Sequence, residues 1–291
     1  MMTEPWTIGT LLQWTKQYFQ GKGVDNPRLD ADVLLSSLLG KDRLYLYVHF
    51  DQPLQQEELA AFRDMVRRRA ARVPVAYIIG RREFMGLDFQ VSPAVLVPRP
   101  DTEILVEAAI NRLSAVAGGT ILDVGTGSGA VLIGTLSRTA DCRGVGVDIS
   151  QPALEVAEAN AARLLPPGQA TFLQADLFPP QPASFDAILS NPPYITSCEM
   201  ESLQPEVLQE PALALHGGTD GLDFYRRLIA GGRAYLKTDG FMAFEVGAGQ
   251  APAVSGLAAQ QGWRSEQIIK DYSGIERIVV LRPANQEVIG A

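Results

Sequence analysis

The sequence contains few of the residues that build metal centres and disulfide frameworks. Among its 291 residues are two cysteines, Cys142 and Cys198, and two histidines, His49 and His216. Neither the cysteines nor the histidines have the spacing of metal ligands, and neither histidine lies in a recognisable triad pattern. We therefore expect no bound metal and two reduced thiols, which is typical of a cytoplasmic protein.

Long uncharged segments are also missing. No run of about 18 apolar residues occurs, so the sequence predicts no membrane span. Residues 1–6 contain no basic stretch followed by an apolar one, which a secretory signal requires. The length and an apolar content of 46% instead allow one large domain or two smaller ones, each with its own core.

Basic residues are fewer than acidic ones, which gives a net charge of −8. Residues 1–100 carry 13 Lys and Arg against 11 Asp and Glu, whereas residues 101–291 carry 12 against 22. Nucleic-acid binding through the backbone depends on neutralising phosphates, so the acidic second part argues against it. Five arginines lie within residues 63–72. We interpret them as a solvated helix face, with partner binding as the less favoured alternative.

The first part of the chain has helical periodicity and no strand pattern. Thr7 is a candidate N-cap of a first helix, Gly40 is a candidate stop for a second, and residues 55–72 form a third. We therefore predict a small all-helical domain over residues 1–78.

The last part of the chain, residues 103–291, alternates strands with helices. Strands are expected at 120–124, 144–147, 170–173, 187–190, 241–246, 267–271 and 276–281, and helices at 130–137, 153–164, 224–236 and 251–261. This alternation predicts an α/β domain with a mostly parallel sheet and helices on both faces. Residues 79–102, with a hairpin around Gly86, form the connector between the two domains.

Glycines and acidic residues gather where these strands are predicted to end. The first strand leads into Gly125-Thr126-Gly127-Ser128-Gly129, where glycines let the backbone approach a ligand closely. The second ends in Asp148, whose carboxylate suits the two hydroxyls of a ribose. The third leads to Asp176 and Leu177, which would lie near an adenine amine and against the adenine ring.

Two nucleoside cofactors are compatible with this pattern. A nicotinamide dinucleotide prefers G-x-G-x-x-G, with its pyrophosphate at the helix N-terminus. Here the spacing is G-x-G-x-G, and Ala130 takes the place of the last glycine, which weakens that interpretation without excluding it. S-adenosylmethionine has no pyrophosphate, so the loop favours this cofactor, with S-adenosylhomocysteine as its product.

The fourth strand ends in Asn191-Pro192-Pro193-Tyr194, a sequence that also suits an ordinary turn. Beside a nucleoside pocket, the Asn191 side-chain oxygen and the Pro192 carbonyl would form two acceptors for a planar NH2 group. The Tyr194 ring would offer that group a stacking surface. We predict that Asn191, Pro192 and Tyr194 are catalytic, that Asn191 also contacts the cofactor, and that all four bind the acceptor. The motif does not distinguish a base amine from a side-chain amide.

These strand ends together resemble a class I, Rossmann-like methyltransferase that modifies a planar nitrogen. The segments Gly80-Arg81-Arg82-Glu83-Phe84 and Pro98-Arg99-Pro100-Asp101-Thr102-Glu103 resemble the HemK/PrmC family, protein-(glutamine-N5) methyltransferases that act on peptide-chain release factors. Further matches are Glu210-Pro211, Gly217-Gly218-x-Asp220-Gly221, Phe244-Glu245-Val246-Gly247 and Glu276-Arg277. Leu177 departs from the pattern, since some relatives carry an aromatic residue there.

The resemblance implies the substrate, which is the glutamine of the Gly-Gly-Gln motif in class I release factors, and a helical domain that helps to hold it. No direct nucleic-acid or membrane partner is expected. The residues alone leave four alternatives. They are an adenine-N6 methyltransferase acting on nucleic acid, a ribosomal-protein glutamine methyltransferase, a nicotinamide-dependent oxidoreductase and a non-enzymatic ribosome-associated protein.

Overall fold

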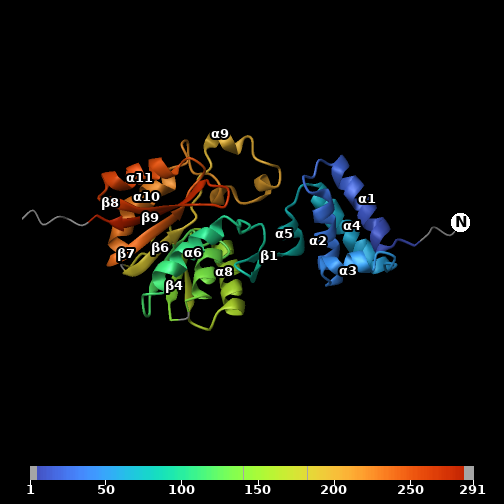
Figure 1. Cartoon of the computed structure of the whole chain (residues 1–291), viewed down its shortest axis with the longest axis horizontal. Coiled ribbons are helices and arrows are strands. Elements are labelled where there is room, and N and C mark those ends of the chain that lie inside the picture. The colour runs from blue at the N-terminus through green and yellow to red at the C-terminus, as the bar shows by residue number, and fades with distance from the viewer. Residues whose placement is uncertain (1–4, 140, 182, 285–291) are drawn as a thin grey trace, which may run out of the picture. The chain divides into compact units, whose positions relative to one another are not determined.

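The computed structural model describes residues 5–139, 141–181 and 183–284, and it separates into two compact units. The first unit comprises Met1–Arg81 together with Gln204–Gln209, and the second comprises Arg82–Leu203 and Glu210–Ala291. Figure 1 labels many of the elements of both units. A short segment late in the chain therefore belongs to the unit that is built mainly from the N-terminal residues.

The first unit is helical in its described residues. Its helices are α1 (Ile8–Gly21), α2 (Pro27–Leu39), α3 (Arg43–Val48), α4 (Gln56–Ala70) and α5 (Val75–Ile79) (Figure 1). Thr7 caps α1 through reciprocal hydrogen bonds with Thr10, and Gly40 ends α2 in a left-handed conformation, both as predicted. The sequence pattern did not predict α3 and α5, because helices of 6 and 5 residues hold too few turns to show a periodic face.

The helices of this unit pack around apolar side chains from each of the longer ones. Ile8, Phe19, Leu34, Leu35 and Phe62 are at most 1% exposed. Complete burial of a side chain of this size contributes about 1.5–3 kcal/mol relative to an exposed position. Tertiary packing therefore stabilises helices that would be marginal in isolation.

The arginine-rich end of α4 is not simply a solvated face. The Arg69 side chain is 6% exposed, with its Nε 2.7 Å from Asp30 Oδ2 and its Nη1 2.7 Å from Glu206 Oε1. Arg72 Nη2 lies 2.7 Å from the other Glu206 oxygen. These four side chains, which we call the Arg69 cluster, hold the segment Gln204–Gln209 within the first unit. The expectation of a solvated face is thus wrong for Arg69, because its charge is matched internally.

The second unit begins with the predicted hairpin. Strands β1 (Arg81–Phe84) and β2 (Leu87–Gln90) form a two-stranded sheet around Gly86, whose φ is 75°. A left-handed residue at such a turn favours glycine. Phe84 and Phe89 pack edge to face in the core of the unit, with ring centroids 5.9 Å apart. The hairpin is therefore anchored by its two aromatic side chains.

The main sheet has seven strands in the order β5-β4-β3-β6-β7-β9-β8. They are β3 (Thr120–Val124), β4 (Arg143–Asp148), β5 (Ala170–Gln174), β6 (Phe185–Ser190), β7 (Leu236–Glu245), β8 (Trp263–Lys270) and β9 (Glu276–Pro283). The strands from β5 to β7 in this order pair in parallel, and β9 is antiparallel to both β7 and β8. The structure confirms the predicted mostly parallel sheet.

Helices cover both faces of this sheet. One face packs against α6 (Thr102–Leu113), α7 (Ala130–Leu136) and α8 (Gln151–Leu164), and the other against α10 (Asp223–Gly232) and α11 (Ala251–Gln260) (Figure 1). Ile121 faces the first set and Leu122 the second, because successive strand residues point to opposite faces. The α9 helix (Ser197–Met200) and the 3₁₀ turns η2 (Ala212–Ala214) and η3 (Arg233–Tyr235) lie in the connections of this unit, whereas the 3₁₀ turn η1 (Val207–Gln209) lies in the late segment of the first unit.

Several element boundaries differ from the prediction, and the strand expected at residues 241–246 begins earlier, at Leu236. The helix expected over residues 224–236 ends at Gly232, since two consecutive glycines are poor helix formers and Leu236 already pairs with Phe185 as part of β7. The strand expected at residues 267–271 begins earlier, at Trp263, because β8 pairs with β9 along its whole length. Among the described residues, no helix has both the length and the apolar character to cross a membrane.

Candidate active site

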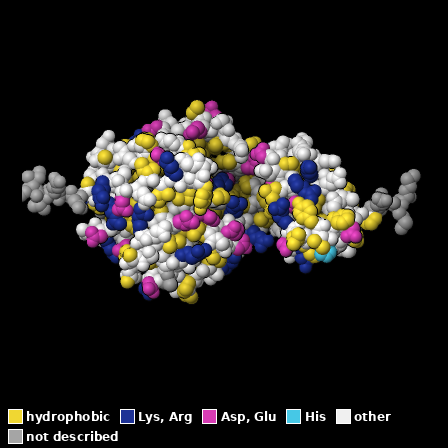
Figure 2. All heavy atoms as spheres, in the orientation of Figure 1, with side chains coloured by type: hydrophobic (Ala, Val, Ile, Leu, Met, Phe, Trp, Pro, Cys, Tyr) yellow, Lys and Arg dark blue, Asp and Glu magenta, His cyan; other side chains and the backbone are white. Residues whose placement is uncertain are grey.

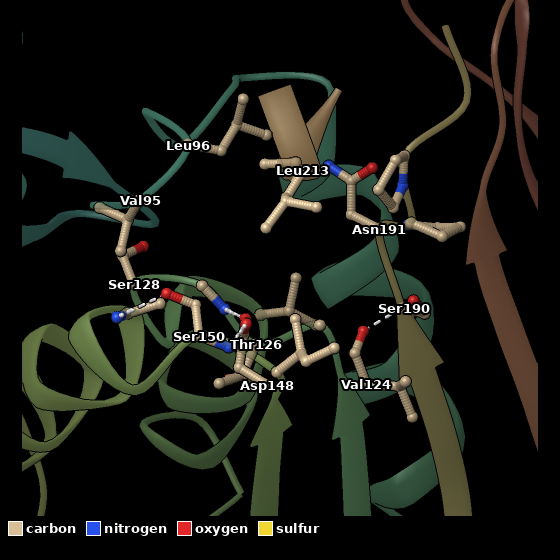
Figure 3. Close-up of a pocket in the computed structure, with 18 of the residues that line it drawn as sticks. Val95, Leu96, Val124, Thr126, Ser128, Asp148, Ser150, Ser190, Asn191 and Leu213 are labelled. Carbon is tan, nitrogen blue, oxygen red and sulfur yellow. Dashed lines mark hydrogen bonds between the residues drawn. The ribbon is translucent and has the colours of Figure 1, made fainter. Parts of the chain in front are cut away.

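The carboxyl ends of the parallel strands meet at one edge of the sheet. Val124 of β3 pairs with Val147 of β4 and with Ser190 of β6, and Ser190 pairs with Phe244 of β7. The residues that follow these strands are therefore delivered to one place, which is where open α/β sheets bind their ligands. A pocket lies there, above the ends of β3, β4 and β6 (Figure 3).

The pocket brings together residues that the sequence predicted from separate segments. Of the predicted set, the lining contains Gly125, Thr126, Gly127, Ser128, Asp148, Asp176, Leu177, Asn191, Pro192 and Pro193. Gly129 and Tyr194 are not part of the lining. The rest of the wall includes two segments that we did not predict as site residues, and Figure 3 labels Val95, Leu96 and Leu213 from them.

The glycine loop between β3 and α7 is braced from below by a buried acid. Asp123 Oδ2 accepts hydrogen bonds from Thr126 Oγ1 at 2.7 Å and from the Leu132 backbone N at 3.2 Å. Burial raises the pKa of Asp123 to about 7, against the opposing effect of these bonds. Asp123 is 1% exposed, so it holds the loop and does not line the pocket.

Gly129 has a role in this loop that differs from lining the pocket. Its φ is 81°, and it directly precedes α7. A Cβ atom at this position would approach Ile133 Cδ1 to 2.7 Å, which is closer than real Cβ contacts. Gly129 therefore allows the tight turn and the close packing of α7, while Gly125 and Gly127 face the pocket.

Asp148 lies at the end of β4 with its carboxylate oriented by two backbone groups. Its Oδ2 accepts from the Gly127 N and its Oδ1 from the Ser150 N, each at 2.9 Å (Figure 3). Each carboxylate oxygen has a further lone pair that can accept another hydrogen bond. Such a carboxylate fits the two adjacent hydroxyls of a ribose, which is the arrangement that the sequence led us to expect.

Asp176 and Leu177 follow β5 at the side of the pocket. Asp176 Oδ2 accepts from Arg227 Nη2 at 2.8 Å, and both side chains are about half exposed. An exposed pair of this kind contributes only about 0.2–1 kcal/mol, so Asp176 can exchange it for a ligand contact. Leu177 has a φ of 70°, an uncommon value for a residue with a side chain, and such conformations cluster at functional sites.

Asn191 is linked to two side chains that the sequence did not predict as site residues, to the first directly and to the second through the first. Its Nδ2 donates to Thr102 Oγ1 at 3.1 Å, and the Thr102 hydroxyl donates to Glu245 Oε2 at 2.6 Å. We call these three residues the Glu245 chain. Thr102 begins α6 and Glu245 ends β7, and both lie in segments that indicated the family without indicating a chemical role.

Glu245 and Thr102 are largely shielded from solvent, with 2% and 4% exposure. Burial raises the pKa of Glu245 to about 7 and outweighs the hydrogen bond from Thr102, which lowers it. Asp101 raises the same pKa further, while Arg277 and Arg99 lower it. The chain behind Asn191 thus ends in a carboxyl group that titrates close to neutral pH.

The backbone of Pro193 and Tyr194 is fixed by close packing. A Cβ atom on Gly217 would lie 2.7 Å from both the Pro193 carbonyl oxygen and the Tyr194 Cα. Gln250 Nε2 donates to the Tyr194 carbonyl oxygen at 3.0 Å. Burial, reinforced by the charge of Glu245, raises the pKa of the Tyr194 hydroxyl to about 12. Tyr194 is therefore a neutral side chain behind the pocket wall.

The few cysteines and histidines contribute nothing to the pocket lining. Cys142 is buried and Cys198 exposed, and both are free thiols. His216 Nε2 lies 2.9 Å from Ser197 Oγ, and His49 Nδ1 lies 3.1 Å from the Tyr45 carbonyl oxygen, so each ties a local segment. Within residues 5–139, 141–181 and 183–284, no group of three or more His, Cys, Asp or Glu is placed to hold a metal ion.

Two family models match the chain. The model described as the PrmC N-terminal domain matches residues 10–80, and the methyltransferase small domain matches residues 100–219. A release factor glutamine methyltransferase of Geobacter sulfurreducens is 45% identical over 278 residues, covering 95% of this chain and 96% of its own length. Its counterpart in Moorella thermoacetica is 42% identical over 257 residues, covering 88% and 91%.

Solved structures share the fold of about two thirds to three quarters of this chain at much lower identity, covering 67% and 73% of it. A methyltransferase from Pyrococcus furiosus matches with a TM-score of 0.50 and 18% identity over 67% of this chain and 88% of its own. The hMettl16 catalytic domain, in complex with the MAT2A 3'UTR hairpin 6, matches with a TM-score of 0.55 and 13% identity over 73% and 81%. These likenesses concern the fold alone and agree with the predicted Rossmann-like methyltransferase architecture.

Proposed function

The chain belongs to the family of release factor glutamine methyltransferases, and from this premise we propose its reaction. It transfers a methyl group from S-adenosylmethionine to the side-chain amide nitrogen (N5) of the glutamine in the Gly-Gly-Gln motif of class I peptide-chain release factors. The observation that carries the proposal is the orientation of Asn191 at the pocket wall. Its amide nitrogen is engaged by Thr102, so its oxygen is left for the NH2 group of an acceptor.

The residues beside β3, β4 and β5 suit S-adenosylmethionine. Asp148 offers two oriented oxygens for the ribose hydroxyls, and the loop 125–129 brings backbone close to the ligand. Leu177 and Ala130 supply apolar surface in the pocket lining, and Asp176 supplies an acceptor for the adenine amine. When bound, the cofactor supplies an electrophilic methyl group on its sulfonium.

On the acceptor side, Asn191 and Pro192 hold the amide nitrogen. The nitrogen of a carboxamide is a poor nucleophile, since its lone pair is delocalised into the carbonyl. Asn191 Oδ1 and the Pro192 carbonyl oxygen accept one hydrogen each, which aims the nitrogen and stabilises the positive charge that develops on it. The following Pro193 has no N–H, so no backbone donor competes there for these acceptors. Tyr194 supports the wall and takes no proton, and the proton leaves to solvent after transfer.

A methylation assay with several acceptors tests the proposal. The full-length protein is incubated with labelled S-adenosylmethionine and, separately, a class I release factor, a mixture of ribosomal proteins and DNA. We expect label on the release factor alone, mapped by mass spectrometry to the Gly-Gly-Gln glutamine, and none on a release factor whose motif glutamine is replaced by alanine. Label on ribosomal protein or DNA instead would support the corresponding alternative and overturn the proposed substrate.

The substitution Asn191→Ala tests the acceptor side of the pocket. We expect turnover to be nearly abolished, while S-adenosylhomocysteine binds with nearly the wild-type affinity in calorimetry. Removing a single preorganised hydrogen-bonding group at a reacting centre costs about 100- to 1,000-fold in kcat. Near-normal methylation of the release factor by this variant would remove Asn191 from its assigned role.

A further inference from the structure

A side-chain amide such as that of Asn191 has two ends of nearly the same shape and opposite hydrogen-bonding character. Rotation by half a turn exchanges its oxygen, which accepts, for its NH2 group, which donates. An inverted Asn191 would present N–H groups to the N–H groups of the acceptor. Something in the protein must therefore select one orientation if the side chain is to receive an NH2 group.

We propose that Glu245, acting through Thr102, selects the orientation of the Asn191 amide in which Oδ1 faces the acceptor. The inference rests on the proposed function, because the orientation matters only if Asn191 receives an amide nitrogen. Glu245 and Thr102 are positioning residues in this scheme. Neither needs to touch the substrate for the orientation to be set.

The selection follows from counting protons along the Glu245 chain. An ionised carboxylate only accepts hydrogen bonds, and a hydroxyl has one proton to give. Thr102 gives its proton to Glu245 Oε2 at 2.6 Å, so towards Asn191 it can only accept. The Asn191 group that faces Thr102 at 3.1 Å must therefore be the donor Nδ2, and Oδ1 is directed away.

Burial makes this selection strict. Glu245 and Thr102 are 2% and 4% exposed, so water does not compete for their hydrogen bonds. Thr102 begins α6, Glu245 ends β7 and Asn191 directly follows β6, so all three are placed by regular elements of the second unit.

Protonation of Glu245 removes the selection. A neutral carboxyl group can donate to Thr102, whose own proton is then free to turn towards Asn191, and both amide orientations become available. Burial places the pKa of Glu245 at about 7, so the change falls near neutral pH. The selected orientation is thus present above this pKa and is lost as the pH falls through it.

Other groups face Glu245 from the neighbouring elements. Against the effect of burial, hydrogen bonding to Asp271 and the charge of Asp101 raise the pKa of Arg277, so Arg277 keeps its charge near neutral pH. Tyr194 and Tyr225 remain neutral, because the pKa of Tyr194 is about 12 and burial raises that of Tyr225 well above its ordinary value. Tyr225 in addition donates to the Glu245 backbone carbonyl at 2.8 Å. The charged and titratable groups in question are Arg99, Arg277, Asp101, Tyr194 and Tyr225.

The substitution Thr102→Val tests the link, since it keeps the shape of the side chain and removes the hydroxyl. We expect kcat for release-factor methylation to fall about 100-fold, the size of effect that misplacing a reacting group produces. S-adenosylhomocysteine affinity should stay within about twofold of wild type, because the cofactor groups are untouched. Thr102→Ser keeps the hydroxyl and should restore most of kcat.

Thr139→Val is the matched control. Thr139 is also buried in the second unit, and its hydroxyl donates to the Thr135 carbonyl at 2.8 Å, outside the pocket lining. We expect this variant to lose thermal stability to a similar extent and to keep wild-type kcat. It separates an effect on Asn191 from a general loss of a buried hydroxyl.

The pH profile of Glu245→Gln supplies a readout that a purely structural role would not affect. Glutamine both donates and accepts and does not titrate, so it cannot select one orientation. We expect wild-type kcat to rise with pH through about 7, the pKa of Glu245. In the variant, that rise should vanish and kcat at about pH 8.5 should be about tenfold below wild type, since a neutral partner replaces a charged one.

The outcomes distinguish failure of the orienting role of Thr102 and Glu245 from failure of the proposed function. If the wild-type protein methylates the release factor and Thr102→Val does so equally fast, the orienting role is overturned while the proposed function stands. The orienting role is also overturned, and the proposed function stands, if kcat of Glu245→Gln rises with pH in the same way as kcat of the wild type. If the wild-type protein does not label the release factor at all, the proposed function is overturned and the inference with it.

Discussion

Each unit of this protein encloses a glutamate that comes from a distant segment of the chain, but the two glutamates have different partners. Glu206 meets Arg69 and Arg72 of the helical unit, with 2.7 Å contacts to each. The Glu245 carboxylate accepts a hydrogen bond from the hydroxyl of Thr102, at 2.6 Å. The negative charge of Glu206 is balanced by two arginines, whereas the ionisation of the Glu245 carboxyl group depends on pH.

The pKa values of the two carboxyl groups move in opposite directions. Burial alone would raise the pKa of Glu206, but hydrogen bonds from Arg72 and Arg69 outweigh it and hold the pKa below the ordinary value. Burial of Glu245 outweighs the bond from Thr102 and raises its pKa to about 7. In the helical unit the glutamate therefore holds a segment of the chain, whereas in the catalytic unit the glutamate can change its protonation state.

The consequences for stability have opposite signs. Ionised Glu206 stabilises the folded state above the pKa of the unfolded chain, and this contribution is lost as the pH falls through the lowered folded pKa. Ionised Glu245 is penalised in the folded state. The penalty is absent below the ordinary glutamate pKa of 4.5, grows as the pH rises, and is complete above about 7.

The largest expected effect comes from removing the cation at the centre of the Arg69 cluster. Arg69→Met leaves Asp30 and Glu206 without their shared partner, and breaking a buried pair in this way costs about 3–5 kcal/mol. Urea unfolding followed by fluorescence should show that the free energy of unfolding of the helical unit falls by this amount. A loss below about 1 kcal/mol would mean that the cluster is not a stabilising feature, since that is the range of exposed pairs.

The same substitution at the two glutamates should have opposite effects on stability. At about pH 8, Glu245→Gln should raise the free energy of unfolding by on the order of 3 kcal/mol, because it removes the cost of ionising a buried group whose pKa is raised from 4.5 to about 7. Glu206→Gln should lower it by about 1–3 kcal/mol, since a charged acceptor of two arginines is lost.

Thermal unfolding of these two variants over a range of pH makes the comparison sharp. The gain from Glu245→Gln should disappear as the pH falls below about 4.5, because the wild-type carboxyl group then becomes neutral in both states. A gain that does not depend on pH would show that the ordinary packing of the amide, rather than the charge, explains it. The variant would be more stable and less active, as expected where a functional group is retained at a cost in stability.

Asp148 belongs neither to the Arg69 cluster nor to the Glu245 chain. A substitution there tests cofactor binding independently of both. Asp148→Ala should weaken S-adenosylmethionine binding by about 1.5–3 kcal/mol for each ribose hydrogen bond lost, since the acceptor is charged. Isothermal titration calorimetry measures this directly, with Glu245→Gln as the control that keeps wild-type affinity. Unchanged affinity of Asp148→Ala would exclude this carboxylate from the cofactor site.

The smallest effect is expected at Arg67, which lies on the same helix as Arg69 and pairs with Asp64. Their side chains are 80% and 50% exposed, and exposed pairs three residues apart contribute about 0.5 kcal/mol or less. Arg67→Ala should therefore leave urea unfolding within about 0.5 kcal/mol of wild type. A larger loss would mean that this side chain, like Arg69, has a partner inside the protein.

The parts of the site that follow strands could be predicted from the sequence. Glycines, Asp148 and Asn191 stand directly after apolar segments, and parallel strands deliver their ends to a common edge. On the face shown in Figure 2, Lys and Arg are interspersed with Asp and Glu, which fits the charge argument against a broad basic surface. Sequence position also indicated the hairpin around Gly86 and the cap at Thr7, because turns and caps depend on neighbouring residues.

The partners of Asn191 and Arg69 could not be predicted in the same way. Thr102 and Asn191 are 89 residues apart, and Thr102 and Glu245 are 143 apart, so no periodicity relates them. The five arginines in residues 63–72 look alike in sequence, yet Arg67 is exposed and Arg69 is buried. Their difference depends on Glu206, which joins the helical unit from far along the chain.

The sequence by itself determined the class of fold, the order of its elements and which side chains stand at the strand ends, because these depend on short-range patterns and on the geometry of parallel strands. Only the tertiary structure decided which end of the Asn191 amide faces the pocket and which arginines are enclosed. Hydrogen-bond direction and burial depend on residues that meet after folding. The orientation that the proposed reaction needs is therefore a property of the packed unit, carried by a threonine and a glutamate far from the motif itself.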